Sequence, residues 1–435
     1  MPEASSGSTA EQEQVAVVVV GAGQAGLATS WHLRQAGIDH VVLEASTAGH
    51  EWADTRWDSF TLVTPNWQCR LPGYAYDGPD PDGFMNREEV VTWLGGYPAT
   101  FDPPLVEHTR VTSLTQDPDG FTVTSIGPDG EVTRRAEAVV VATGGYHIPV
   151  VPAWALALDP SVHQLTASDY QNPASLPEGA VLVVGSGQSG AQIAEDLHLA
   201  GRQVHLAIGD APRVARTYRG RDSMTWLAEM GLYDTPVAQY PGGLAAREKT
   251  NHYVTGRDGG HDIDLRRFAA DGMRLHGLLT EGSGTTLRFR PTLRRSLDSA
   301  DAVYNSICAD IDRYIEAEGV QAPPPSRYEP VWQPDENTDQ ELLDLDLAEA
   351  GITSVVWAIG YRPDYRWVEV GVFDGTGRPT HQRGVTAVRG LYFLGLPWLH
   401  TWGSGRFLGI AEDAEHVATH LARHVVAAPR ASVGS

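Results

Sequence analysis

The chain has 435 residues, enough for two or three domains at about 100 to 200 residues each. Its 55 acidic against 32 basic residues give a formal net charge of -23, which argues against nucleic acid or an anionic membrane as a general partner, because both reward clustered lysine and arginine. The only two cysteines, Cys69 and Cys308, lie far apart, so sequence neighbours can form neither a CxxC redox motif nor a thiolate metal site.

The chain ends and the hydropathy bear on localisation. Residues 1–13 are small, polar and acidic, and we expect them, like residues 427–435, to form a disordered tail. The N-terminal tail has neither the basic start nor the apolar run of a signal peptide, and no stretch approaches about 18 uninterrupted apolar residues. The sequence therefore predicts a cytoplasmic protein without a membrane partner.

A dinucleotide-binding pattern follows the N-terminal tail. VAVVVV (15–20) predicts a buried strand, and a second strand ends at Glu44. Between them, a GxGxxG loop opens a helix; its glycines are Gly21, Gly23 and Gly26. The glycines allow a tight turn, close approach to a pyrophosphate and close helix packing, and the acid accepts from ribose hydroxyls. The order of these features predicts an adenine dinucleotide site.

The same eight-residue pattern occurs a second time as VVGSGQSG (183–190). The two strand-loop-helix units align without a gap, and the glycines of the second copy are Gly185, Gly187 and Gly190. Ile208 stands where the first unit has Glu44, although Asp210 follows two residues later. The ribose acceptor at the strand end is therefore missing from the second unit.

Four arginines follow the second unit in RVARTYRGR (213–221). Guanidinium groups just beyond the second strand are what a 2'-phosphate requires. We therefore expect FAD at the first loop and NADPH at the second, with Arg213 and Arg216 as phosphate contacts. The alternative is a surface loop whose arginines pair with acidic neighbours.

Further stretches occur in an order typical of one group of flavoproteins. They are GAGQAGL (21–27), GHEWADTRWDSFTLVTPN (49–66), VVVATGG (139–145), GSGQSGAQIAEDL (185–197), VVWAIGYRPD (355–364) and GLYFLGLPWLHTWGSG (390–405). On these stretches, residues 15 to about 425 resemble the flavin-containing and Baeyer-Villiger monooxygenases, and bacterial members of unassigned substrate most closely. The family signature FxGxxxHxxxY is not matched: anchored on Tyr170, its Phe, Gly and His positions are Pro160, Val162 and Thr166.

The resemblance implies an α/β fold with two Rossmann-like dinucleotide-binding domains. The FAD-binding domain is expected to be discontinuous, at 14–170 and 346–426, with VVWAIGYRPD as the strand that returns to it. The NADPH-binding domain is expected at 171–345, with substrate-side elements within 222–295 and 322–336. PDG turns independently predict an antiparallel β-meander over 107–142.

The resemblance also implies a reaction. An NADPH-dependent monooxygenase of this kind lets reduced FAD react with O2 to a C4a-(hydro)peroxyflavin and transfers one oxygen atom to a small molecule, with N- or S-oxygenation favoured. A Baeyer-Villiger oxygenase, an NADPH oxidase or quinone-type reductase, and a redox-sensing flavoprotein with negligible turnover remain open. The sequence assigns no oligomeric state.

Individual site residues are implied by the same resemblance. Asn66 lies near the place where N- and S-oxygenating relatives carry an amide close to the flavin, and the alternative is a TPN turn. Arg56 could neutralise a phosphate or reduced flavin, or pair with Asp58. Trp52 matches a family tryptophan beside the FAD diphosphate, and Val111 matches a strand residue whose backbone meets adenine.

The remaining cofactor contacts lie in two turns: Thr143 and Gly144 in the ATG turn, and Ser189 in the second glycine loop. For His147, His400 and Trp402, which adjoin flavin-binding segments, a structural role is the favoured interpretation. His261, Asp262 and Asp264 could suggest a metal, but acids beside DLRR more often form an ion-paired turn, so we expect no metal site.

Two helices are expected from their apolar stripes. A helix over 296–318 would place Cys308 in the core. A final helix over about 405–424 would point its N-terminus at the flavin and stabilise negative charge there.

Overall fold

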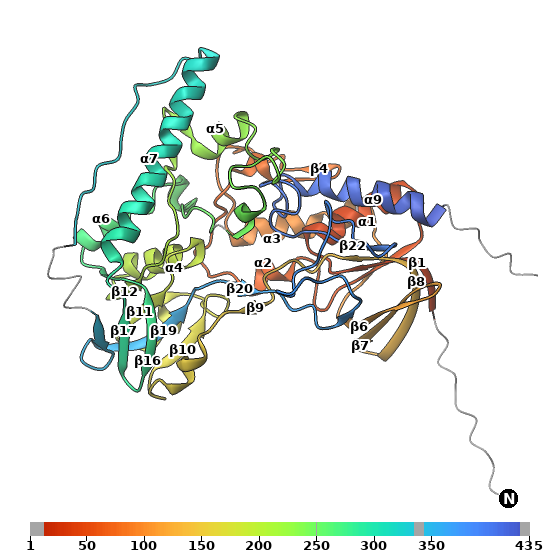
Figure 1. Ribbon diagram of the computed structural model, residues 1–435, viewed down its shortest axis with the longest axis horizontal. Coiled ribbons are helices and arrows are strands. Elements are labelled where there is room, and N and C mark those ends of the chain that lie inside the picture. The colour runs from red at the N-terminus through yellow and green to blue at the C-terminus, as the bar shows by residue number, and fades with distance from the viewer. Residues whose placement is uncertain (1–12, 249, 335–342, 427–435) are drawn as a thin grey trace, which may run out of the picture.

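The computed structural model describes residues 13–248, 250–334 and 343–426, and arranges them in two halves, each built around a sheet (Figure 1). The predicted disordered tails at 1–13 and 427–435 lie outside the described residues, except for Glu13, which begins the first strand. Among the described residues, no helix has both the length and the apolar character that crossing a membrane requires.

The first half contains an eight-stranded sheet of order β21-β6-β7-β8-β1-β2-β5, in which β22 also pairs with β8. Its strands are β1 (Glu13–Val20), β2 (His40–Leu43), β5 (Leu105–Val106), β6 (Arg110–Asp117), β7 (Gly120–Gly127), β8 (Gly130–Val141), β21 (Val368–Glu369) and β22 (Leu391–Phe393). β8 pairs antiparallel with β7 at its start and parallel with β22 at its end. The predicted meander is thereby confirmed, and β8 joins it to the parallel part of the sheet.

The last four valines of β1 are buried on both faces of this sheet, as a central parallel strand requires. Val17 and Val19 belong to the core under the helices, whereas Val18 and Val20 belong to the core on the other face. The covering helices α1 (Gln24–Gln35) and α9 (Ile410–Val426) lie side by side in Figure 1.

Shorter elements complete the first half. They are α2 (His50–Asp54), α3 (Arg87–Gly96) and the hairpin β3 (Arg70–Leu71) and β4 (Tyr74–Ala75). Asn86 and Glu89 form a capping box at the start of α3.

The final helix starts later than the sequence predicts. It begins at Ile410, not near residue 405. Gly405 has a left-handed φ of +77°, and a Cβ on Gly409 would lie only 2.6 Å from the carbonyl oxygen of Gly403. The glycines therefore form a tight turn before the helix, in the segment that the sequence assigns to the flavin.

The second half contains a five-stranded parallel sheet of order β10-β19-β11-β12-β15. Its strands are β10 (His163–Thr166), β11 (Ala180–Val184), β12 (Val204–Ala207), β15 (Arg274–His276) and β19 (Ile352–Trp357). The same stretch of chain also contains α4 (Gln188–Leu199), α5 (Ser223–Glu229), α6 (Leu265–Ala270), α7 (Leu293–Glu318), β13 (Thr217–Tyr218), β14 (Arg221–Asp222), β16 (Leu279–Ser283), β17 (Thr286–Phe289) and β18 (Asp344–Asp346).

The position of β19 differs from the sequence-based boundaries. The sequence predicts VVWAIGYRPD as the strand that returns to the first half, but β19 pairs with β10 and β11 in the second sheet. The turn after β19 also lies against the second glycine loop: a Cβ on Gly185 would lie 2.5 Å from Ala358 O, just as one on Gly21 would lie 2.9 Å from Ala142 O. Each glycine loop thus packs against the turn after a neighbouring strand of its own sheet.

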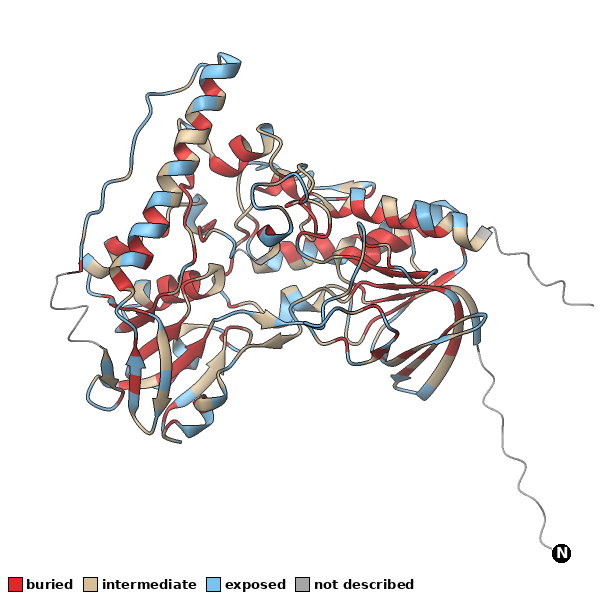
Figure 2. Ribbon diagram, in the orientation of Figure 1, coloured by how far each residue is buried: buried red, intermediate tan, exposed pale blue. Residues whose placement is uncertain are grey.

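The long helix α7 stands at the outer side of the second half (Figure 1). It begins at Leu293, three residues before the predicted start, and ends before Gly319, whose φ is +66°. Figure 2 shows that its inner side is buried and its outer side exposed. Cys308 is 2% exposed, which confirms its predicted place in the core.

A short ribbon lies between the two halves in Figure 1. It consists of the antiparallel strands β9 (Ile148–Pro149) and β20 (Tyr361–Arg362). The chain passes from the first half to the second after β9, and returns through β20.

Candidate functional site

The two glycine loops have the same backbone geometry. Gly21 N donates to Leu43 O (2.8 Å), and Gly185 N donates to Ala207 O (3.0 Å). The third glycine of each loop permits close contact between helix and loop. A Cβ on Gly26 would lie 1.8 Å from Gly21 O, and one on Gly190 would lie 1.9 Å from Gly185 O. Both loops therefore hold the first turn of a helix tightly against the end of a strand.

The middle glycine of each loop faces space that a ligand can use. A Cβ on Gly23 would meet nothing within 4 Å, and one on Gly187 would meet only Thr250 Cγ2 at 3.8 Å. Gly23 and Gly187 are the N-caps of α1 and α4, and no side chain caps either helix. The first-turn N–H groups are thus available to a phosphate, which is what a bound dinucleotide requires.

Glu44 directly follows β2 and lies beside the first glycine loop. Its side chain is nearly buried and accepts from Ala22 N (2.7 Å) and Ser46 N (2.9 Å). His50 Nδ1 lies 3.5 Å from the same carboxylate, and the pKa of His50 is raised mainly by its hydrogen bond to Glu51. Each carboxylate oxygen keeps a second lone pair, so the fixed carboxylate can still accept from ribose hydroxyls.

The ATG turn after β8 contains a buried polar atom without a partner. Thr143 Oγ1 makes no hydrogen bond within the described part of the chain. Gly144, with a φ of +77°, accepts from Tyr365 OH at 2.6 Å. His147 lies within hydrogen-bond distance of Thr143 O (3.0 Å) and Asp364 N (2.7 Å), which supports the structural interpretation of this histidine. The free hydroxyl of Thr143 fits a bound cofactor.

Trp52 is connected to the first glycine loop through Gly49, because Trp52 N donates to Gly49 O (3.0 Å) and Gly49 N donates to Ala22 O (3.1 Å). Trp52 stacks on Phe407 with ring centroids 5.3 Å apart. Val111 is buried in β6. The residue just before this strand contacts the end of β2, because Thr109 N donates to Glu44 O at 2.7 Å. The N–H donors in the first turn of α1, the open space at Gly23 and the fixed carboxylate of Glu44 together fit FAD. The contacts assigned to Trp52 and Val111 remain predictions.

The second site has Ile208 at the position where the first site has the carboxylate of Glu44. Ile208 is buried, and Gly209 N donates to Ser186 Oγ (3.2 Å) at the end of β12. Ser189 is half-buried in the first turn of α4. Asp210 is the first carboxylate after β12, and its side chain is 78% exposed. The fit to a second dinucleotide therefore rests on the cradle at Gly187 and the first turn of α4.

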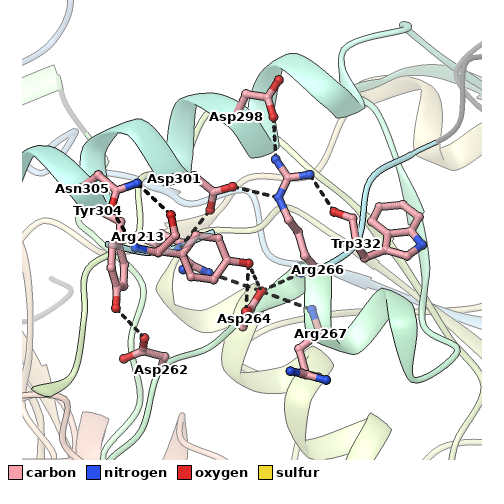
Figure 3. A network of polar contacts seen from close by, with 11 residues as sticks. Arg213, Asp262, Asp264, Arg266, Arg267, Asp298, Asp301, Tyr304, Asn305 and Trp332 are labelled. Atoms are coloured by element: carbon pink, nitrogen blue, oxygen red, sulfur yellow. Dashed lines mark hydrogen bonds and ion pairs between the residues drawn. The ribbon is translucent and has the colours of Figure 1, made fainter. Parts of the chain in front are cut away.

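Arg213 lies in a network of carboxylates and aromatic rings (Figure 3). Its side chain is 3% exposed, and its nitrogens lie 3.3 Å from both Asp264 and Asp301. The guanidinium carbon also lies 3.8 Å and 4.5 Å from the ring centroids of Tyr328 and Tyr304. This placement does not favour the predicted contact with a 2'-phosphate.

The guanidinium of Arg216 also has its partners within the protein. Its side chain is 2% exposed, and its guanidinium binds Asp222 (2.6 Å) and Val63 O (2.7 Å). The other two arginines of this stretch pair with Asp312 and Glu229. The structure therefore shows the alternative interpretation of RVARTYRGR, a segment paired with acidic neighbours.

Asp262 and Asp264, which could suggest a metal site in the sequence, instead contact the arginine-containing segment 213–221. Asp262 accepts from Arg216 N (2.5 Å) and Tyr304 OH (3.1 Å), and His261 pairs with Glu195 at 2.7 Å. The pKa of His261 is raised mainly by this hydrogen bond. Within the described residues, no three His, Cys, Asp or Glu side chains lie close enough to hold a metal ion.

An exposed arginine that the sequence did not indicate lies beside the second site. Arg295, in the first turn of α7, is 3.9 Å from Asp210 and 72% exposed. Ser296 Oγ donates to Asp210 at 3.2 Å, so this turn lies against the end of β12. Only the fold brings α7 to the strand end, and no local sequence signal connects the two segments.

Asn66 is buried, and its side chain bridges backbone groups. Its Nδ2 donates to Asp80 O (2.9 Å), and its Oδ1 accepts from Met85 N (2.7 Å). These contacts give the amide a structural role, and a catalytic role for Asn66 remains a prediction.

Arg56 does not make the ion pair that the sequence left open. Asp58 pairs with Arg87 at 3.0 Å instead. Arg56 Nη1 donates to the carbonyl (3.1 Å) and hydroxyl (2.6 Å) oxygens of Thr55, and the guanidinium lies 5.2 Å from the ring centroid of Trp52. The guanidinium thus stays available for an anion.

The two cysteines are buried thiols. Cys69 is 0% and Cys308 is 2% exposed, and burial raises the pKa of each thiol to about 12. Both remain protonated at neutral pH and are poor nucleophiles. These placements support the sequence-based argument against a dithiol relay within the chain.

Comparisons with known proteins agree with this geometry. A family described as pyridine nucleotide-disulphide oxidoreductase matches residues 18–228. An uncharacterised CzcO-like oxidoreductase of Geobacillus kaustophilus is 32% identical over 416 residues, which are 95% of this chain and all of the relative. The indole-3-pyruvate monooxygenase YUCCA6 of Arabidopsis thaliana is 31% identical over 208 residues, which are 45% of this chain and 48% of the relative. The solved structure of a flavin-containing monooxygenase from Stenotrophomonas maltophilia has a TM-score of 0.63 at 19% identity, over 94% of this chain and 98% of that one.

Proposed function

The chain belongs to the CzcO-like family of flavin monooxygenase-type oxidoreductases, and from that premise we propose that it uses FAD, NADPH and O2 to insert one oxygen atom into a small molecule. N- or S-oxygenation is the reaction that we favour. Membership in this family confirms the resemblance found in the sequence.

One observation carries the proposal: two equivalent nucleotide cradles are joined by a short segment. Thr250 lies over Gly187 of the second loop. The next residue, Asn251, accepts from Arg406 Nη2 at 2.9 Å in the segment before α9, and in the same segment Gly405 O accepts from Gln24 Nε2 (2.7 Å) of the first loop. A dinucleotide at each loop would therefore extend toward the same junction between the halves.

When bound, FAD would take two electrons from the nicotinamide and pass them to O2, while the chain binds, orients and shields the cofactors. The cradles at Gly23 and Gly187 would hold the phosphates, and Glu44 the ribose. Buried aromatic residues cover the junction: Tyr233 stacks on Trp402 with centroids 4.5 Å apart, and Trp398 packs beside them. Such a shell would exclude water from the reacting atoms.

The test follows electrons and oxygen separately. The FAD-loaded protein would be reduced anaerobically with NADPH and then mixed with 18O2 and a panel of amines and sulfides. We expect bleaching of the flavin absorbance, and a product carrying one 18O atom. Quantitative H2O2 release without labelled product from the whole panel would instead support an NADPH oxidase, and efficient dye reduction would support a reductase.

Two matched variants test the assignment of the loops. Gly23→Val fills the first cradle and Gly187→Val fills the second, so each should remove one dinucleotide only. We expect Gly23→Val to lose FAD during purification, and Gly187→Val to keep FAD yet lose its reduction by NADPH. Loss of FAD from Gly187→Val with unchanged thermal stability would contradict the assignment.

A further inference from the structure

The glutamine of each glycine loop holds a distant segment of the chain against that loop. Gln24 and Gln188 occupy the same position in the two loops, and each is the first residue of its helix. Gln24 Nε2 donates to Gly405 O (2.7 Å), 381 positions later in the chain. Gln188 Nε2 donates to Val254 O (2.6 Å), and Gln188 Oε1 accepts from Val254 N (3.3 Å). The same residue type at the same loop position thus makes the same kind of contact at both sites.

The two segments held by the glutamines also contact each other. Asn251 Oδ1 accepts from Arg406 Nη2 (2.9 Å) and from Trp402 Nε1 (3.4 Å). The guanidinium of Arg406 lies 4.9 Å from a ring centroid of Trp402, and its Nε donates to Trp402 O (3.1 Å). Arg406 directly follows Gly405 in the chain, and Asn251 lies three residues before Val254. A continuous series of contacts therefore runs from the first glycine loop to the second.

Both held segments have irregular backbones. Residues 250–252 and 402–409 belong to no helix or strand. Side-chain contacts contribute more to the order of such segments, because they have fewer backbone hydrogen bonds than a helix or a sheet. The second segment also borders the cradle, since a Cβ on Gly187 would lie 3.8 Å from Thr250 Cγ2. A dinucleotide at Gly187 would therefore lie against this segment and restrict its motion.

Segments that contact each other and border two sites connect the binding of two ligands. The first ligand to bind restricts the motion of the connected segments, so the second ligand loses less conformational entropy when it binds. The effect is reciprocal, because each ligand must change the affinity for the other by the same factor. Couplings of this kind typically change an affinity by about 5- to 150-fold.

We propose that the side chains of Gln24, Arg406, Asn251 and Gln188, here called the glutamine bridge, couple the two dinucleotide sites, so that NADP+ at the second loop strengthens the binding of FAD at the first. The proposal rests on the proposed function and concerns the regulation of the same two sites. The four side chains act through contacts with each other and with backbone groups, and are therefore positioning residues. The bridge retains FAD while coenzyme is bound and weakens its binding when coenzyme dissociates.

The experiment measures the affinity for FAD with and without NADP+. The FAD-loaded protein would be diluted in steps, and the released FAD would be measured by its fluorescence. NADP+ is the probe because it occupies the second site without reducing the flavin, and calorimetry would establish the concentration that saturates the protein. We expect saturating NADP+ to lower the Kd for FAD about tenfold. A Kd for FAD that saturating NADP+ leaves unchanged would overturn the proposal.

Variants assign the coupling to the bridge. Asn251→Leu removes the shared acceptor at similar size, and should reduce the effect of NADP+ on the Kd for FAD to less than about twofold. Arg406→Met removes the donor, and the double variant should show no further loss than Asn251→Leu alone, because both changes break the same contact. Asn251→Asp keeps an acceptor for the guanidinium and should retain the coupling. Asn305→Leu is the matched control: this asparagine joins α7 to Tyr328, and its loss should leave the coupling unchanged.

The outcomes separate this proposal from the proposed function. The coupling is a ratio of two Kd values, so a variant that merely weakens FAD binding changes both values and leaves the ratio unchanged. If Asn251→Leu has the same ratio as the unmodified protein, the bridge does not couple the sites and the proposal is wrong. If the coupling depends on the bridge but no labelled product forms, the monooxygenase proposal fails and the coupling stands. Unfolding curves identify variants that fail to fold, and Gln188→Met, which breaks the bridge at its other end, would then replace Asn251→Leu.

Discussion

At the scale of the residue, the partners of a side chain decide its role more than its type does. Arg213 follows the second strand of a dinucleotide-binding unit, where a guanidinium can meet a 2'-phosphate. In the fold it lies between Asp264 and Asp301 and against two tyrosine rings (Figure 3). The charge of Arg213 is thus paired with carboxylates inside the protein. Arg295, by contrast, is an exposed arginine beside Asp210.

This difference predicts opposite behaviour for two variants. Arg213→Met removes the buried guanidinium that lies against Asp264 and Asp301. Asp301 keeps its ion pair with Arg266 at 2.8 Å, so we expect a loss of about 3 kcal/mol in the free energy of unfolding, at the lower end of the cost of breaking a buried ion pair. Arg295→Gln should leave stability unchanged and raise the KM for NADPH but not for NADH. Urea unfolding and steady-state kinetics with both coenzymes measure the two effects. If the Arg213→Met protein is stable and its KM rises for NADPH alone, Arg213 is the contact of the 2'-phosphate instead.

At the scale of the element, neighbouring strands create environments that neither strand has alone. β12 and β15 pair in parallel and bring His205 and His276 together, with Nδ1 of His205 3.0 Å from Nε2 of His276. The rings stack at 5.2 Å, and His276 also stacks on Phe289 at 4.8 Å. Burial lowers the pKa of His205 to about 4 and that of His276 to about 3.

The histidine pair predicts a loss of stability in mild acid. Above pH 6.5 both histidines are neutral in the folded and the unfolded chain, so they cause no pH dependence there. Below pH 6.5 the unfolded chain takes up protons that the folded chain does not accept until about pH 4, so stability falls across that window. His276→Phe removes one such group and should reduce the loss between pH 7 and pH 5 by about 2 kcal/mol. Unfolding curves at both pH values check this, and an unchanged pH dependence would contradict it.

At the scale of the whole molecule, one carboxylate connects parts of both halves. Asp196 of α4 accepts from Ser59 Oγ (2.6 Å), Tyr170 OH (2.7 Å) and Arg257 Nη1 (2.8 Å). Ser59 lies in the first half, Tyr170 before the second unit, and Arg257 in the segment that follows Asn251. The contacts thus fix α4, and the second cradle at its start, relative to the flavin half.

Loosening this connection should affect electron transfer more than coenzyme binding. In Asp196→Asn the Arg257 contact loses its charge, so we expect flavin reduction by NADPH to slow about tenfold, because small misplacements of reacting groups are costly. The Kd for NADPH should stay unchanged, since Gly187 and the first turn of α4 are untouched. Stopped-flow reduction across NADPH concentrations separates the two quantities, with Asp310→Asn on α7 as the control. Equal loss in both would show that Asp196 supports only the fold.

The sequence by itself determined the two dinucleotide units. Their glycine offsets are local backbone requirements, and the pairing of Val17 with His40 recurs as that of Val181 with Val204. Local patterns also sufficed for the meander and for Cys308 in the core. Only the tertiary structure decided the partners of the arginines and the place of β19 in the second sheet. These features depend on contacts between residues far apart in the chain, and no local spacing records which distant carboxylate, strand or ring will be near.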